Sequence, residues 1–260
     1  MKRLAPPFRA ADARGVRAVF TDFDGTLTTD GKLLASTYAS LERLARAGVP
    51  VVIVTGRPAG WGESMVRSWP VAAVVTENGG VTFLGGQGGA IERVYGLDAR
   101  TLPATRKKMH AAAARVARRV PGARLSSDSR YTEVDLAIDW NEEVHLAPER
   151  AREIEALLRK AGFNAVRSSV HVNFWPGTFD KLSACRHVVR RLLGGAPLHR
   201  FVYVGDALND EPMFGGFPRS IGVRGIEAVW SELVTRPAFL TVRDGGLGFE
   251  EMARAIRAAR

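Results

Sequence analysis

The chain has 260 residues, of which 46% are hydrophobic, and its 37 lysines and arginines outnumber its 27 acidic residues. This length is enough for one large domain or for a core with an insertion, and the positive charge favours an anionic partner. Cys185 is the single cysteine, which excludes an intramolecular disulfide and a cysteine-rich zinc site.

Targeting and membrane-spanning signals are absent from the sequence pattern. The first 15 residues are basic and interrupted by prolines, and they lack the apolar stretch of a signal peptide. The longest strongly apolar run, 49–54, is far too short to span a bilayer. We therefore expect a cytoplasmic protein with no membrane partner.

The first third of the chain predicts strands that alternate with helices. An apolar strand at 18–20 runs into Asp22, and apolar residues spaced by three and four predict a helix within 33–48. The segments 49–56 and 71–80 contain continuous apolar runs, which are typical of parallel strands covered by helices on both faces. This third therefore has a βαβ pattern.

The last third returns to the same rhythm. It predicts, in chain order, a helix at 181–195, a strand at 201–206, a short helix at 210–214, a strand at 220–223, a helix at 226–234, a strand at 238–242 and a helix from Gly248. Together the two ends predict an α/β fold whose core is a doubly wound, Rossmann-like parallel sheet.

The middle of the chain has a different pattern. A helix at 102–120 carries an apolar stripe opposite a basic face, and a second helix is predicted within 147–162. The strands at 132–140 and 169–175 alternate between apolar and polar residues, which indicates a sheet covered on one side only. We read the basic face as a solvated surface, with a ligand surface as the alternative.

These patterns predict two domains. The core comprises 1–85 and 174–260, and an inserted α/β cap comprises 86–173. The glycine-rich segment 83–90 is read as the hinge between them.

Two carboxylates follow the first strand in the sequence Asp22-Phe23-Asp24-Gly25. Doubly wound sheets bind ligands at the carboxyl ends of their strands. There one aspartate can attack phosphorus while the other protonates the leaving oxygen and later deprotonates water. Neighbouring acids also favour Mg²⁺, and Gly25 allows a tight turn. Taken alone, however, Asp-x-Asp-Gly is also typical of an ordinary turn.

The sequence DFDGTLT at 22–28 resembles the first motif of the haloacid dehalogenase-like phosphatase superfamily. The resemblance implies that Asp22 is the nucleophile and Asp24 the general acid/base. VIVTGR at 52–57 resembles the second motif, with Thr55 hydrogen-bonding the phosphoryl group and Gly56 and Arg57 beside the substrate.

Two further motifs follow in the order of that superfamily. FDKLSA at 179–184 resembles the third, which makes Lys181 the lysine that holds the charges of nucleophile and phosphate together. YVGDALND at 203–210 resembles the fourth, which makes Asp206 and Asp210 metal-binding acids and Asn209 a substrate contact. The implied metal set is Asp22, Asp24, Asp206 and Asp210, and the implied cofactor is Mg²⁺.

The position of the insertion and the sequence ENGG at 77–80 resemble subclass IIB, which includes Cof-like, sucrose-phosphate and mannosyl-3-phosphoglycerate phosphatases. The cap of that subclass closes the site and selects the substrate. We therefore expect Asn78, His171 and Asn173 to contact the substrate, and Glu77 to lie on the substrate side.

The predicted function is a Mg²⁺-dependent phosphatase that acts on a small phosphorylated metabolite, either a sugar phosphate or a phosphoglycerate-linked sugar. A phosphomutase of the phosphomannomutase type is the first alternative, and a signalling module phosphorylated on aspartate is the second. The basic helix lacks interleaved aromatic residues, so a nucleic-acid partner is not expected. No pattern in the sequence indicates an oligomeric state.

Overall fold

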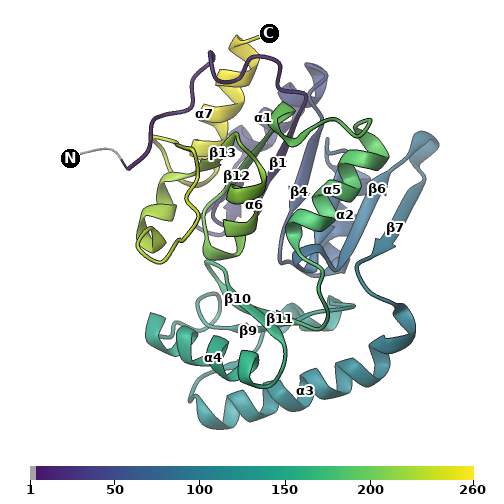
Figure 1. The fold of residues 1–260 in the computed structure, drawn as a ribbon, viewed down its shortest axis with the longest axis vertical. Helices are drawn as coiled ribbons and strands as arrows, with labels where there is room; N and C mark the ends of the chain where they lie inside the picture. The colour runs from purple at the N-terminus through teal and green to yellow at the C-terminus, as the bar shows by residue number, and fades with distance from the viewer. Residues whose placement is uncertain (1–3) are drawn as a thin grey trace.

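A computed structural model describes residues 4–260 and shows a larger lobe above a smaller one (Figure 1). An eight-stranded sheet forms the larger lobe, in the order β14-β13-β12-β1-β4-β5-β6-β7. The strands are β1 (Ala18–Thr21), β4 (Val51–Val54), β5 (Ala73–Thr76), β6 (Val81–Gly85), β7 (Ile91–Tyr95), β12 (Phe201–Gly205), β13 (Ser220–Gly222) and β14 (Phe239–Leu240). The strands from β14 to β5 are parallel, which confirms the predicted Rossmann-like sheet.

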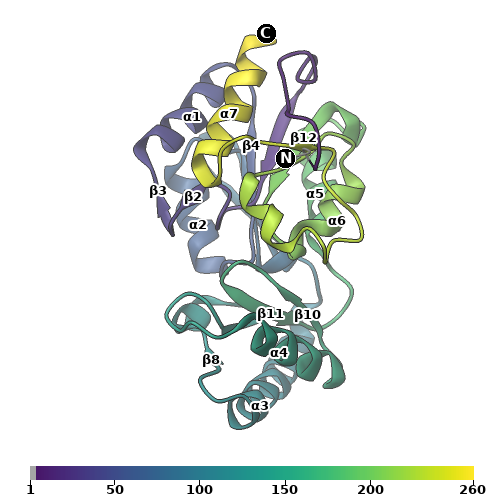
Figure 2. The same ribbon diagram turned by 90° about the vertical axis from the view of Figure 1, so that its left-hand side faces the viewer.

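Helices cover both faces of this sheet, as Figure 2 shows. One face packs against α1 (Ala35–Arg46), α2 (Ala59–Ser68) and α7 (Gly245–Ala258), and the other against α5 (Lys181–Leu192) and α6 (Glu211–Gly216). Neighbouring residues of one strand therefore enter different cores. Val19 packs with α1 and α7, whereas Phe20 packs with α5 and α6. This double burial explains the continuous apolar runs in the sequence.

The smaller lobe, here called the cap, is a four-stranded antiparallel sheet with two helices on one face. Its strands run in the order β10-β11-β9-β8. The elements are α3 (Leu102–Arg119), β8 (Arg124–Leu125), β9 (Leu136–Asp139), α4 (Pro148–Lys160), β10 (Asn164–Arg167) and β11 (His171–Trp175). Val172 and Phe174 pack with the helices, whereas His171 and Asn173 lie on the opposite face, toward the larger lobe.

Two positions differ from the sequence-based prediction at the start of the insertion. The segment 91–95, expected in the cap, forms strand β7 and pairs with β6 at the edge of the core sheet. The glycine-rich segment, expected as a hinge, is the hairpin turn between these strands, where Gly88 and Gly89 have φ of 67° and 77°. A glycine-rich sequence suits a turn with positive φ as well as a flexible connection, so composition did not distinguish them.

Smaller differences occur toward the C-terminus. The predicted helix at 226–234 is instead a 3₁₀ turn over Arg224–Val229, and α7 begins at Gly245, before the predicted start. Ile226 and Val229 are three residues apart, a spacing that a 3₁₀ turn satisfies as well as an α-helix does. A short hairpin of β2 (Thr28–Thr29) and β3 (Lys32–Leu33) follows the first aspartate motif. Within 4–260, no helix is long and apolar enough to cross a membrane.

Candidate active site

Side chains from all four motifs meet at the carboxyl ends of the central strands of the core sheet. Asp22 directly follows β1, Thr55 follows β4 and Asp206 follows β12, and these three strands are parallel neighbours. Lys181 is the first residue of α5, whose start is fixed by the Asp180 side chain accepting a hydrogen bond from the Ser183 N–H. The parallel strands therefore bring together residues that lie far apart in the sequence.

Lys181 is buried and shared between two aspartates. Its Nζ lies 2.8 Å from Asp22 Oδ1 and 2.7 Å from Asp210 Oδ1. Burial alone would lower the pKa of Lys181, but the carboxylates of Asp210 and Asp22 raise it above its usual value. The side chain is therefore a permanent ammonium group against the predicted nucleophile.

Asp22 is 4% exposed, and this burial raises its pKa to about 7. The neighbouring charge of Asp210 also raises the pKa, whereas Lys181 opposes the rise. Its Oδ2 accepts no hydrogen bond from any residue of 4–260. Asp22 therefore has one oxygen neutralised by a lysine and one oxygen available for chemistry.

Asp210 is fully buried, and both of its oxygens are occupied. Oδ1 accepts hydrogen bonds from Lys181 and from the Tyr203 hydroxyl, and Oδ2 accepts from the backbone N–H groups of Asp206 and Ala207. A side chain at Gly205 would lie 2.4 Å from Asp210 Oδ2. Asp210 thus fixes both the lysine and the loop that carries Asp206.

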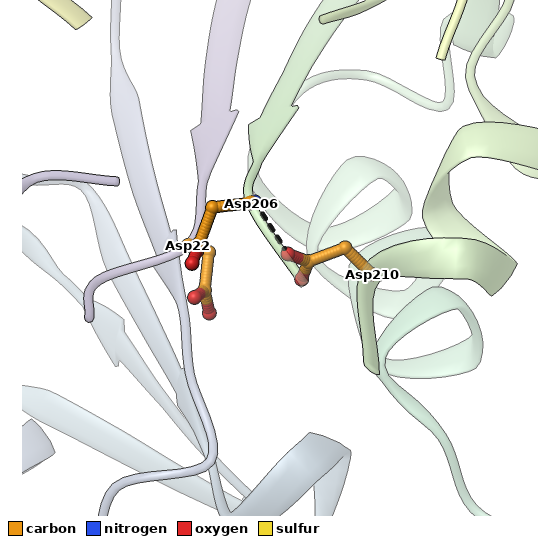
Figure 3. Close-up of side chains that lie close together, drawn as sticks. All are labelled: Asp22, Asp206 and Asp210. Carbon is orange, nitrogen blue, oxygen red and sulfur yellow. Dashed lines mark hydrogen bonds between the residues drawn. The ribbon is translucent and has the colours of Figure 1, made fainter. Parts of the chain in front are cut away.

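Asp206 lies beside Asp22 at the end of the adjacent strand (Figure 3). Its Oδ1 accepts a hydrogen bond of 2.9 Å from the Thr26 hydroxyl. The backbone of the first motif comes close to it, because a Cβ at Gly25 would lie 2.3 Å from Asp206 Oδ2. Gly25 also has φ of 72°, so this position favours glycine for both its conformation and its lack of a side chain.

Three acids of this site lie close enough together to hold a metal ion. Asp22, Asp206 and Asp210 each offer a carboxylate oxygen within 4.8 Å of the others. Carboxylate oxygens are the ligands that Mg²⁺ prefers. Burial, together with the charges of Asp22 and Asp210, raises the pKa of Asp206 well above its usual range. A cation would relieve this repulsion.

Asp24 lies outside this acidic cluster, because its carboxylate binds Arg57. The Arg57 Nε and Nη2 donate to the two oxygens of Asp24 over 2.8 and 2.7 Å. The remaining N–H groups of Arg57 donate to Glu142 and Asp128 of the cap. The Cζ of Arg57 lies 4.8 Å from the centre of the Trp61 ring. The assignments of Asp24 as a metal ligand and of Arg57 as a substrate contact stay predictions.

Thr55 is buried at the end of β4 and shapes the second motif. Its hydroxyl accepts the backbone N–H of Arg57 over 3.0 Å, and its carbonyl accepts the N–H of Asn78. The hydroxyl hydrogen makes no hydrogen bond to another residue of 4–260. It is therefore free to donate to a phosphoryl oxygen, as predicted for this residue.

A polar group joins the core and cap beside Thr55. Asn173 of β11 donates to the carbonyl of Gly56 over 3.2 Å and to Asp135 over 3.3 Å, and Asn78 also donates to Asp135. Asp135 is fully buried, and burial followed by the charge of Glu77 raises its pKa well above the usual range. The structure thus gathers Gly56, Asn78 and Asn173, three predicted substrate contacts, at the boundary of the two lobes.

The two other predicted substrate contacts lie apart from this group. The Nε2 of His171 lies 2.8 Å from Glu142 Oε2, and this contact, together with Arg57, lowers the pKa of Glu142 to about 2. Asn209 is buried, and its Oδ1 accepts no hydrogen bond within 4–260. It lines a cleft of about 780 Å³ between the lobes, together with Lys181 and Asn78. Asn209 is thus available to a ligand, whereas His171 contacts a cap residue.

Glu77 anchors the cap to the core. Its carboxylate accepts hydrogen bonds from the backbone N–H of Ala59 and from three consecutive cap residues, over 2.6 to 2.9 Å. The cap residues are Glu133, Val134 and Asp135. Glu77 has φ of 51°, and Asn78 follows with 55°. The Glu77 carboxylate therefore has a structural role in place of the expected substrate-side one, because its four accepted hydrogen bonds come from Ala59 of the core and from three residues of the cap.

Sequence reasoning missed Glu142, Asp128 and Tyr203. Glu142 lies in an irregular segment of the cap and Asp128 in a short 3₁₀ helix, in the sequences WNEE and SSDSR, which carry no motif. Tyr203 stands inside an apolar strand, where the single hydroxyl was the available signal, because a buried tyrosine usually finds a hydrogen-bond partner.

Comparisons with known proteins give a consistent result. A family model described as haloacid dehalogenase-like hydrolase matches residues 19–108. A phosphoglycolate phosphatase of Methanothrix thermoacetophila is 26% identical over 246 residues, which cover 94% of this chain and 98% of that protein.

Two solved structures show the same fold over nearly the whole chain. The sucrose-phosphatase of Synechocystis sp. PCC6803, solved with sucrose and phosphate, has a TM-score of 0.65 at 15% identity and covers 94% of this chain and 98% of its own. A sugar phosphatase of haloacid dehalogenase subclass IIB has a TM-score of 0.62 at 16% identity, with 93% and 98% covered.

Proposed function

We propose that this chain, a haloacid dehalogenase-like phosphatase, hydrolyses a small phosphorylated metabolite with Mg²⁺ as cofactor and Asp22 as the residue that carries the phosphoryl group. The observation that carries the proposal is the environment of Asp22. One of its oxygens is neutralised by Lys181, the other accepts no hydrogen bond within residues 4–260, and two further acids lie within 4.8 Å. By comparison, both oxygens of Asp210 accept two hydrogen bonds each.

The reaction has two steps. Asp22 Oδ2 attacks phosphorus, the bond from phosphorus to the leaving oxygen breaks, and protonated Asp24 gives its proton to that oxygen. Water then attacks the aspartyl phosphate, Asp24 takes a proton from the water, and inorganic phosphate leaves with Asp22 restored. Lys181 and the Thr55 hydroxyl stabilise the charge on the transferring group. When bound by Asp22, Asp206 and Asp210, Mg²⁺ would supply further neutralisation of phosphate charge.

The substrate class proposed is a sugar phosphate or a phosphoglycerate-linked sugar. Support comes from the 780 Å³ cleft, which is lined by Asn78 and Asn209. Each of these has a buried Oδ1 that accepts no hydrogen bond within 4–260. Such oxygens can accept hydrogen bonds from hydroxyl groups. A sugar supplies these groups, whereas phosphoglycolate has no hydroxyl other than those of its acid groups. The names of two structural neighbours, a sucrose-phosphatase and a sugar phosphatase, support this choice.

The test is phosphate release from p-nitrophenyl phosphate, phosphoglycolate and a panel of sugar phosphates, with Mg²⁺ or with EDTA. We expect turnover that needs Mg²⁺ and is lost in Asp22→Asn by a factor on the order of 10⁴ or more. Asp30→Asn is the matched control, because Asp30 is exposed and its positive φ suits asparagine. Turnover that survives Asp22→Asn would refute the proposal.

The same experiment separates the alternatives. A phosphomutase would convert one sugar phosphate into its isomer and release little phosphate. A signalling module would hold the phosphoryl group on Asp22 without turnover. Either result would replace the phosphatase proposal.

A further inference from the structure

We propose that Glu142 of the cap is a positioning residue for Asp24 and acts through Arg57, so that the proton-transferring carboxylate is fixed in place when the cap is docked. The inference rests on the proposed function, in which Asp24 protonates the leaving oxygen. It assigns a role in the reaction to a cap residue that belongs to none of the four motifs.

The guanidinium of Arg57 is held from two sides by carboxylates. The two oxygens of Asp24 accept hydrogen bonds from Nε and Nη2, over 2.8 and 2.7 Å. Glu142 takes the edge formed by Nη2 and Nη1, over 2.6 and 3.1 Å. Asp128 accepts the last N–H, from Nη1, over 3.3 Å. All five N–H groups thus donate to carboxylates, and paired contacts of this kind fix the plane of the guanidinium.

The two lobes divide these contacts unequally. Asp24 and Trp61 belong to the core, and Glu142 and Asp128 belong to the cap. Glu142 is in turn held by its surroundings in the cap. Its backbone N–H donates to Asp139 Oδ1 over 3.0 Å, and its carboxylate lies 2.8 Å from His171 Nε2.

Separation of the lobes would therefore remove three of the five hydrogen bonds of Arg57. The guanidinium would keep the paired contact with Asp24, but its position would be defined by core residues alone. Arg57 is 6% exposed and Asp24 14% in the docked arrangement, and both line a cleft of about 630 Å³ together with Glu142. Glu142 thus sets where Arg57 lies, and Arg57 sets where Asp24 lies.

A positioning role for Asp24 can be separated from a general structural role by the choice of leaving group. An alkyl phosphate, such as a sugar phosphate, expels a strongly basic alkoxide and needs a proton donor. An aryl phosphate such as p-nitrophenyl phosphate expels a stable phenolate and needs little help. Because kcat/KM reports the steps up to the first irreversible one, it isolates transfer to Asp22 from the later hydrolysis.

The experiment compares Glu142→Gln with Glu143→Gln. Glu143 is the adjacent acid, but its carboxylate contacts Arg124 and Ser127 within the cap. Both variants are assayed with p-nitrophenyl phosphate and with the sugar phosphate that the wild type hydrolyses fastest. For Glu142→Gln we expect kcat/KM to fall by about tenfold or more for the sugar phosphate and to stay within about twofold for the aryl phosphate. Glu143→Gln should leave both values unchanged.

Equal losses on the two substrates, or no loss on either, would overturn the inference while leaving the proposed function intact. A wild type inert on every phosphate would overturn both. Circular dichroism and the thermal midpoint verify folding. Asp128→Asn, which removes the single 3.3 Å contact, should show the same selectivity with a smaller loss, and it keeps the test decisive should Glu142→Gln fold poorly.

Discussion

Lys181 and Arg57 are two buried cations that each bind an aspartate of the first motif, and they differ in where their other partners come from. Lys181 binds Asp22 and Asp210, and all three belong to the core. Arg57 binds Asp24, but its other acidic partners come from the cap. The surroundings of Asp22, the proposed nucleophile, therefore come from the core alone, whereas those of Asp24, the proposed acid/base, come from both lobes.

This difference in partners indicates that the core and the cap contribute to different steps of the proposed reaction. Phosphoryl chemistry at Asp22 depends on parallel strands whose positions are fixed by two apolar cores. Protonation of the leaving group concerns the part of the substrate that varies, and that part would lie beneath the cap. The position of Asp24 at the boundary couples the geometry of the proposed acid/base to the cap, the lobe that we expect to select the substrate.

Removing the core cation should have the largest effect. Lys181→Met leaves the buried carboxylates of Asp22 and Asp210 without their counter-charge, so we expect a loss of about 3–5 kcal/mol in the free energy of unfolding by urea. Added Mg²⁺ should recover part of the loss, because it binds the folded state. Lys107→Met, on the exposed face of α3, should stay within about 0.5 kcal/mol of the wild type. Equal stability of Lys181→Met and the wild type without Mg²⁺ would contradict the claim that Lys181 neutralises the buried carboxylates of Asp22 and Asp210.

A second substitution tests the close approach of the first motif to Asp206. Gly25→Ala and Gly31→Ala both place a Cβ at positive φ, but only the first meets another side chain, Asp206 Oδ2 at 2.3 Å. Each should lose about 1–3 kcal/mol of stability from backbone strain. Only Gly25→Ala should also weaken Mg²⁺ binding, measured by calorimetry. Equal Mg²⁺ affinity in the two variants would argue against the site described.

Glu77 provides a way to loosen the cap without touching Arg57. In Glu77→Gln, an amide NH₂ would face backbone N–H donors, leaving buried groups unpaired at a cost of about 1–3 kcal/mol. We expect faster proteolysis in the two connections between the lobes, 96–101 and 176–180. Glu92→Gln, which removes a surface pair with Arg191, is the control. Unchanged proteolysis would show that Glu77 does not hold the cap.

The smallest expected effect concerns pH. Because the pKa of Asp22 is raised to about 7, a proton must leave before the carboxylate can bind a cation. Mg²⁺ affinity should therefore be constant well above pH 7 and fall by up to about tenfold per pH unit below it. Calorimetry at pH 6, 7 and 8, in buffers of different ionisation enthalpy, measures the affinity and the released proton. An affinity independent of pH would contradict the raised pKa.

Much of the core could be predicted from the sequence, because each strand there is buried on both faces and gives a continuous apolar run. The same runs predict Asp22, Thr55 and Asp206 at strand ends, and the structure brings these residues together at the carboxyl ends of neighbouring parallel strands. Reading the glycine-rich segment 83–90 as a hinge places residues 91–95 in the insertion. In the structure these residues form an edge strand that is half-buried at Ile91 and Val94 and exposed elsewhere, so it gives no continuous apolar run.

The partners of Arg57 could not be predicted in this way. Glu142 and Asp128 lie outside the strands and α-helices of the cap and more than 70 residues from Arg57, and their contact with Arg57 depends on how the two sheets pack together. The hydrogen bonds of Glu77 could not be predicted for the same reason, because the four backbone N–H groups that donate to its carboxylate lie on α2 and directly before β9. Packing between lobes leaves no periodic signal in a single sequence.

The most direct test of the central claim is to look for the phosphoryl group on Asp22. Wild type, Asp24→Asn and Asp22→Asn are mixed with p-nitrophenyl phosphate and Mg²⁺, quenched in acid after less than one turnover, digested and analysed by mass spectrometry. The account predicts a phosphorylated peptide containing Asp22 in the wild type, more of it in Asp24→Asn because hydrolysis lacks its base, and none in Asp22→Asn. Turnover without phosphorylated Asp22 in any sample, or a phosphoryl group on another residue, would contradict it.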